Sequence, residues 1–131
     1  MKFSALLLIA VMPLTAFARI GETREQCDKR YGKVTVSPLE HEGIQYLAYR
    51  VHGLAIDLHI IASKCEKIKY TKEDYGMLAK EEIEALLNEN GTEWQQVSKH
   101  DWKNQQSSAK VSGKYLVITS KAYQKHAAAK R

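Results

Sequence analysis

The residues with the clearest potential for chemistry are three histidines and three carboxylates in one stretch of sequence: Glu40, His41, Glu42, His52, Asp57 and His59. Imidazole and carboxylate groups bind zinc and transfer protons in acid–base catalysis. Asp57 and His59 are two residues apart in a segment of alternating polarity, so they share one face of a predicted strand. A zinc site needs three or four ligands at about 2.0–2.2 Å, and no His-x-x-x-His or Cys-x-x-Cys spacing enforces that convergence. We interpret the set as a solvated face, and a small metal-dependent or hydrolytic enzyme using His52, Asp57 and His59 is the alternative.

Two tryptophans lie in an otherwise polar and basic segment, residues 91–106. Trp94 adjoins a predicted strand, and we expect it to pack in the core. Trp102 is flanked by charged residues, and both core packing and partner contact are open for it. An exposed tryptophan offers a partner a large contact area at low entropic cost. We therefore take Trp102 and the neighbouring lysines as the candidate binding residues: Trp102, Lys99, Lys103, Lys110 and Lys114.

The first eighteen residues have the layout of a secretory signal peptide. Met1-Lys2 is a short positive region, Phe3–Met12 is almost wholly apolar, and Ala16-Phe17-Ala18 is a small-residue cleavage pattern. The apolar run is shorter than the roughly 20 residues that span a bilayer, so we expect no permanent membrane span. The sequence therefore predicts a cleaved leader, 1–18, and an exported protein, periplasmic or extracellular, of bacterial type.

Charge is unevenly distributed along the remaining chain. Residues 19–90 hold eleven Lys/Arg against thirteen Asp/Glu, whereas residues 91–131 hold eight against two. Export argues against a nucleic-acid target, so the basic part suits an acidic envelope protein or an anionic surface polymer. An ordinary solubilising surface is the alternative interpretation.

The two cysteines, Cys27 and Cys65, would be exported to a compartment that permits disulfides. A bridge between them would close a loop of roughly forty residues and stabilise the fold by about 3–4 kcal/mol. We expect this disulfide. Two free thiols are the alternative, and a nucleophilic cysteine is less favoured because no histidine base is assigned to it.

Alternating polarity dominates residues 44–70 and predicts antiparallel strands joined at His52-Gly53 and at residues 62–64. One predicted face is apolar: Leu54, Ile56, Leu58 and Ile60. Further strands are expected at 33–37, 93–97, 109–111 and 115–119. Helices are expected over 21–32, with Thr23 and Gln26 as a capping box, and over 78–90, with a last short helix after Ser120 that frays into a basic tail, about 121–131. We predict one α+β domain, 19–131, of short helices on an antiparallel sheet, with two degenerate helix-then-strands units.

The first of these units, GETREQCDKRYG followed by a hairpin, resembles small exported α+β modules of the β-lactamase-inhibitory-protein repeat and BamE/SmpA type. The resemblance covers residues 21–70 mainly, and the chain lacks the lipid-attachment cysteine of BamE/SmpA after its leader. It implies a non-enzymatic, protein-binding role in the envelope and assigns no functional residue.

No phosphate-binding glycine loop, nucleophile elbow or zinc-protease motif occurs in the sequence. We therefore expect no cofactor and no metal. The sequence favours an exported, non-enzymatic binding module over the enzyme alternative.

Overall fold

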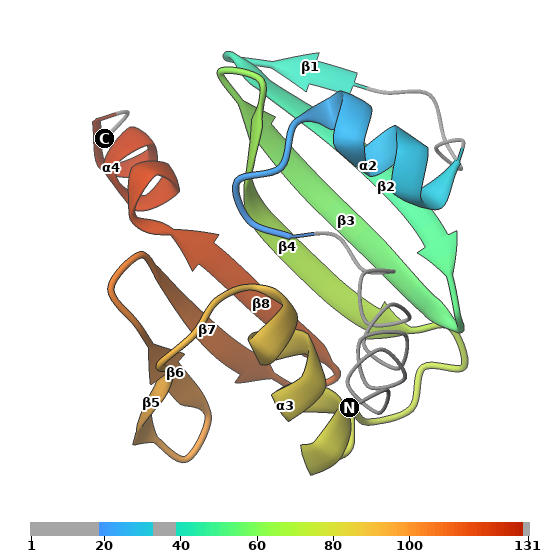
Figure 1. Cartoon of the computed structure of the whole chain (residues 1–131), viewed down its shortest axis with the longest axis vertical. Coiled ribbons are helices and arrows are strands. Elements are labelled where there is room, and N and C mark those ends of the chain that lie inside the picture. The colour runs from blue at the N-terminus through green and yellow to red at the C-terminus, as the bar shows by residue number, and fades with distance from the viewer. Residues whose placement is uncertain (1–18, 33–38, 130–131) are drawn as a thin grey trace, which may run out of the picture.

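The computed structural model describes residues 19–32 and 39–129, and its eight strands form one antiparallel sheet (Figure 1). The strands are β1 Leu39–His41, β2 Ile44–Val51, β3 Leu54–Ile61, β4 Lys64–Lys72, β5 Gln95–Ser98, β6 Asp101–Lys103, β7 Ser107–Ser112 and β8 Tyr115–Ser120. Three helices accompany them: α2 Arg24–Tyr31, α3 Lys80–Glu89 and α4 Lys121–Ala129. The predicted α+β class is confirmed.

The strand order is β1-β2-β3-β4-β8-β7-β6-β5, which is symmetric about the central β4–β8 pair. Each half contains one helix followed by four strands, and α4 follows the last strand of the second half. The last strands of the two halves, β4 and β8, pair at the centre. The helix-then-strands order expected from the sequence is therefore present twice. Joining two four-stranded units at their last strands leaves β1 and β5 as the edges.

The core lies on one face of the sheet, where the predicted alternation is confirmed. Leu54, Ile56, Leu58 and Ile60 on β3 are buried, and the partners of Ile56 and Leu58 in register continue the apolar face through β2, β4 and β8. Cross-strand pairs of aliphatic and aromatic side chains are the unit that stabilises a sheet. The fully buried members are Tyr49, Ile56, Leu58, Ile68, Tyr70, Leu116 and Ile118.

Two-residue turns set the register of the first hairpins. His52 and Gly53 both have positive φ, 51° and 78°, as predicted for a tight turn between Val51 and Leu54. Ala62 and Ser63 make the next turn, also with positive φ, 51° and 70°. Neither is glycine or asparagine, so the sequence indicated only a looser turn there.

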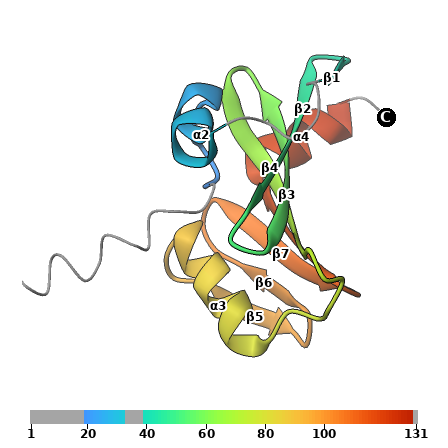
Figure 2. The same cartoon turned by 90° about the vertical axis from the view of Figure 1, so that its right-hand side faces the viewer.

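Helices α2 and α3 cover the core face, and α4 lies on the opposite face (Figure 2). The capping box of Thr23 and Gln26 at the start of α2 is confirmed. Helix α3 places Leu86 and Leu87 in the core. Helix α4 begins after the Ser120 cap, as predicted, but continues to Ala129 where a frayed tail was expected.

The predicted disulfide is wrong, because both cysteines are free and fully buried. Cys27 faces the sheet from α2, and the Cys65 thiol lies 3.8 Å from the carbonyl oxygen of Lys67 on its own strand. Burial raises the pKa of the Cys27 thiol to about 12 and that of Cys65 well above its usual value. Sequence spacing carries no information on the sulfur geometry that a disulfide requires. The two residues act as small apolar core side chains.

Two sequence predictions lie outside the described residues, and one strand was not predicted. The leader, 1–18, and the strand expected at 33–37 lie outside the described residues. Strand β6, Asp101–Lys103, was not predicted, because three residues rich in charge carry no recognisable alternation.

Asn90 at the end of α3 connects three parts of the structure. Its Oδ1 accepts a hydrogen bond from the Ile20 backbone N–H at 2.9 Å. Its Nδ2 donates to the Tyr70 hydroxyl at 3.0 Å and to the Leu86 carbonyl at 2.8 Å. Asn90 is buried, so each lost hydrogen bond would leave a polar group away from water.

We therefore expect Asn90→Ala to lower the free energy of unfolding by about 2–4 kcal/mol, because it leaves one donor, the Ile20 N–H, and two acceptors, the Tyr70 hydroxyl and the Leu86 carbonyl, without their partner. Urea denaturation measures this. Asn88→Ala on the exposed side of the same helix is the matched control and should stay within about 0.5 kcal/mol of the parent. Equal losses in the two variants would contradict this role of Asn90.

Candidate binding surface

The histidine–carboxylate set does not converge in space. His52 lies in the turn before β3, and His59 lies near the other end of that strand. At about 3.3 Å per residue the two are separated by roughly 20 Å along the strand. Asp57 is paired with Lys69 instead, at 3.9 Å. No group of three or more potential metal-ligating side chains occurs among the residues described.

The sheet face opposite the core is here called the open face. It carries a cluster of lysine, aspartate and aromatic side chains. Its side chains follow from the register, because residues paired across an antiparallel sheet point to the same side. One row crosses the whole sheet from β5 to β1: Gln95, Lys103, Ser108, Thr119, Lys67, His59, Tyr46 and Leu39. A neighbouring row runs from β6 to β2: Asp101, Lys110, Val117, Lys69, Asp57 and Ala48.

Four lysines and two aspartates therefore lie on the open face, with aromatic rings among them. Lys69 Nζ lies 4.5 Å from the centroid of the Tyr115 ring, and Lys67 Nζ lies 5.2 Å from that of Tyr123. Contacts of this kind attract a cation to the face of the ring. They position the two ammonium groups without neutralising them.

Helix α4 contacts the open face mainly through Tyr123. The Tyr123 hydroxyl is hydrogen-bonded to His59 Nδ1 at 3.0 Å, and the His59 ring packs edge-on against Tyr46 with centroids 4.6 Å apart. Gln124 Nε2 donates to Ser108 Oγ at 2.6 Å on the other half of the sheet. No side chain of α4 is fully buried, so the helix rests on the face without a core of its own.

Two hollows lie on the open face beside α4. One, of about 620 Å³, is lined by residues of β5 to β8, and its charged groups are Asp101, Lys103 and Lys110. The other, of about 360 Å³, is lined by β1 to β4, and its charged groups are Asp57, Lys67 and Lys69. Each hollow thus combines two ammonium groups and one carboxylate with apolar and small polar side chains.

The residues predicted for binding are divided by this arrangement. Lys103 and Lys110 lie on the open face. Trp102 is paired with the buried Ala109 and packs against the core, and it also adjoins the hollow that Lys103 and Lys110 line. Lys99 and Lys114 occupy the β5–β6 and β7–β8 turns at one end of the sheet. Trp94 packs against the core, as predicted, and donates from Nε1 to the Leu87 carbonyl at 2.7 Å.

Sequence reasoning missed the contribution of Lys67, Lys69 and Tyr123. The segment KIKY does carry the signal, since alternation with the apolar Ile68 and Tyr70 assigns both lysines to the polar face. Only the pairing of β4 with β8 brings them next to the second half of the chain.

The environment of the open face lowers the pKa values of two of its basic groups, His59 and Lys67. Burial and the ammonium groups of Lys67 and Lys69 lower the pKa of His59 to about 4, so its imidazole is neutral at physiological pH. Burial and the charge of Lys69 also lower the pKa of Lys67. An anion placed here would relieve the repulsion between the two lysines.

Comparisons with family models, with curated proteins and with solved structures give no significant match to this chain. The resemblance of residues 21–70 to exported α+β modules therefore stays a prediction. Within the described ranges, 19–32 and 39–129, no helix is both long and apolar enough to cross a membrane.

The lowered pKa of His59 predicts a pH-dependent stability. Between pH 6.5 and about pH 4 the unfolded chain takes up a proton on this imidazole and the folded chain does not. Stability should therefore fall as pH drops through that window. We expect the parent to lose on the order of 1–2 kcal/mol more than His59→Gln between pH 7 and pH 4, measured by urea denaturation.

His100→Gln, at an exposed turn position, is the control and should follow the parent profile. If His59→Gln keeps the full pH dependence, the titrating group lies elsewhere.

Proposed function

We propose that this chain is an exported, non-enzymatic binding module of the bacterial envelope, periplasmic or extracellular, and that its open face binds an acidic protein surface. The observation that carries the proposal is the convergence of Lys67, Lys69, Lys103 and Lys110 on one sheet face. These lysines come from both halves of the chain. Tyrosine rings and two hollows lie on the same face, so a partner can be recognised by its shape as well as by its charge.

Charge and exposure support an anionic partner. Lys103 and Lys110 are exposed, and the open-face aspartates do not balance the four lysines. Electrostatic complementarity of this kind accelerates encounter and selects partners more than it adds raw affinity. Tyrosines at the same place supply contact area that excludes water.

The mixture of charges favours a protein over an anionic polymer as the partner. Asp57 and Asp101 lie among the lysines, one in each hollow. A uniform polyanion would be repelled by both carboxylates, whichever part of its length lay on the face. A folded acidic surface can present a basic or hydrogen-bonding group to each aspartate and carboxylates to the lysines.

The enzyme alternative has less support. His52 is distant from His59 along β3, and Asp57 faces Lys69. The lowered pKa of His59 leaves a neutral imidazole whose Nδ1 is already engaged by Tyr123. A general base works best when its pKa lies near the operating pH, and a pKa of about 4 makes His59 a weak base at neutral pH.

The test is capture from the envelope fraction of the producing organism, with the immobilised exported chain as bait. Lys103→Glu/Lys110→Glu reverses two charges on the open face, and we expect it to reduce capture of the acidic partner at least about tenfold. Lys29→Glu/Lys80→Glu makes the same change in net charge on the helices of the core face and is the matched control. Mass spectrometry of the eluates gives the identities and amounts.

One acidic protein retained by the parent and by the control, and lost from the open-face variant, supports the proposal. Equal retention by the open-face variant contradicts it. Capture of polymer alone, released by raised salt, identifies the anionic-polymer partner instead. A hydrolytic activity that disappears in Asp57→Asn and His59→Gln would establish the enzyme alternative.

A further inference from the structure

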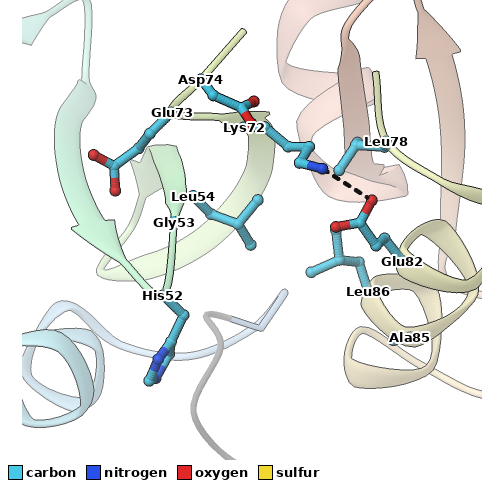
Figure 3. A pocket seen from close by; sticks show the side chains of 10 residues that line it. All are labelled: His52, Gly53, Leu54, Lys72, Glu73, Asp74, Leu78, Glu82, Ala85 and Leu86. Atoms are coloured by element: carbon cyan, nitrogen blue, oxygen red, sulfur yellow. Dashed lines mark ion pairs between the residues drawn. The ribbon is translucent and has the colours of Figure 1, made fainter. Parts of the chain in front are cut away.

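A groove lies between α3 and the ends of β3 and β4, on the core side of the sheet (Figure 3). Its volume is about 390 Å³. The floor is apolar: Leu54 comes from β3, and Leu78, Ala85 and Leu86 come from α3 and the residues before it. The groove can therefore take up an apolar side chain from a partner.

The charged groups around the groove are already paired. Lys72 Nζ lies 3.5 Å from Glu82 Oε1, and Arg50 Nη1 lies 3.5 Å from Glu73 Oε2. Figure 3 shows Glu73 directed away from the groove. Asp74, a further carboxylate of the lining, accepts a backbone N–H at 2.8 Å. A partner of this groove is therefore selected by its apolar surface and not by a charge.

The loop next to the groove presents two large apolar side chains to water. Tyr75 and Met77 lie between β4 and α3 and are 68% and 62% exposed. Neither lines the groove, although Asp74 and Leu78 on either side of them do. Tyr75 and Met77 are here called the plug.

The backbone holds the plug in this exposed position. Tyr75 has a φ of 61°, a left-handed conformation that is unfavourable for a bulky residue. Its N–H donates to the Lys72 carbonyl at 2.9 Å, and the Glu73 N–H donates to the Gly53 carbonyl at 2.9 Å, which ties the loop to the β2–β3 turn. Strained backbone of this kind concentrates at functional sites. A loop that is ordered before binding also loses little entropy when it binds.

We propose that the plug of one copy enters the groove of a second copy, so that the chain forms a two-fold symmetric dimer. In a two-fold interface both copies use the same patch, so that patch must carry a shape and its complement side by side. The plug and the groove meet this condition, because both are apolar and adjoin one another on one surface. Each dimer then contains two plug–groove contacts, and each groove is completed by the partner's plug.

Charge favours a second copy at this place. The chain as a whole has a formal net charge of +5, so two copies repel one another over most orientations. Contact through the lysines of the open face would increase that repulsion. The rim of the groove instead carries two cations against three carboxylates: Arg50, Lys72, Glu73, Asp74 and Glu82. Two copies can therefore meet here without bringing an excess of positive charge together.

The dimer does not depend on the function proposed for the open face. Lys103 and Lys110 line a hollow of the open face and take no part in the groove. Loss of an acidic partner from the open face and loss of the dimer are measured separately.

Sedimentation equilibrium of the exported chain tests the dimer. We expect a monomer–dimer equilibrium between about 1 µM and 1 mM. Raised salt should leave the dimer intact, because the contact is apolar and the repulsion between the two positively charged copies is screened. A parent chain that stays monomeric at about 1 mM, or that forms an open series of larger species, overturns the proposal.

Two variants remove the two halves of the contact. Tyr75→Asn/Met77→Gln makes the plug polar, and asparagine suits the positive φ at position 75. Ala85→Arg places a long side chain over the floor of the groove from an exposed helix position. We expect each variant to raise the dimer Kd at least about tenfold and, since the altered residues are exposed, to stay folded in urea denaturation.

Matched controls make the same chemical changes elsewhere. Leu39→Gln/Val97→Gln removes two comparably exposed apolar side chains, and Asn88→Arg adds the same charge on α3 outside the groove. Both controls should dimerise as the parent does. Equal weakening by a variant and its control contradicts the proposed contact.

A mixture of the two variants distinguishes this dimer from any other. Neither variant can form a plug–groove contact with itself, but the intact plug of Ala85→Arg can enter the intact groove of Tyr75→Asn/Met77→Gln. Leucine methyl groups of the plug variant report this by NMR: Leu54, Leu78 and Leu86 should shift when the unlabelled groove variant is added. Addition of the unlabelled plug variant should shift none of them. If the groove variant leaves these methyl groups unchanged, the proposal is wrong.

Discussion

The pairing of β4 with β8 is the contact on which the rest of the structure depends. Its register aligns Ile68 with Ile118 and Tyr70 with Leu116, which joins the cores of two four-stranded halves into one apolar face. The same register aligns Lys67 with Thr119 and Lys69 with Val117 on the other side. Because side chains alternate with a period of two, a slip by one residue would move Lys67 and Lys69 into the core. Core and open face are therefore fixed by a single alignment.

The two faces then take different roles because the helices are distributed unequally. Helices α2 and α3 bury the apolar face, whereas α4 alone rests on the polar one (Figure 2). Hollows remain on the polar face over β5 to β8 and over β1 to β4. An antiparallel sheet tolerates this, since one of its faces can remain in water. The groove at the ends of β3 and β4 has a related origin, because α3 starts where the first half ends and does not close fully on it.

Much of the fold could be predicted from local pattern. The alternation of β3, the His52-Gly53 turn and the Thr23 capping box each depend on residues within a few positions of one another. The failures have equally local reasons. Ala62-Ser63 adopts a turn that usually calls for glycine or asparagine, β6 is too short to show a period, and the Cys27–Cys65 bridge required a distance between sulfurs that spacing cannot supply.

The sequence by itself determined the α+β class, the apolar face of the central strands and the basic character of the last third of the chain. These follow from period, composition and capping, which are properties of neighbouring residues. Only the tertiary structure decided that Lys67 and Lys69 join Lys103 and Lys110, that Trp102 packs against the core, and that His52 and His59 stay apart. Those outcomes depend on which strands pair and in what register, and such long-range pairing leaves no signature in a local stretch of sequence.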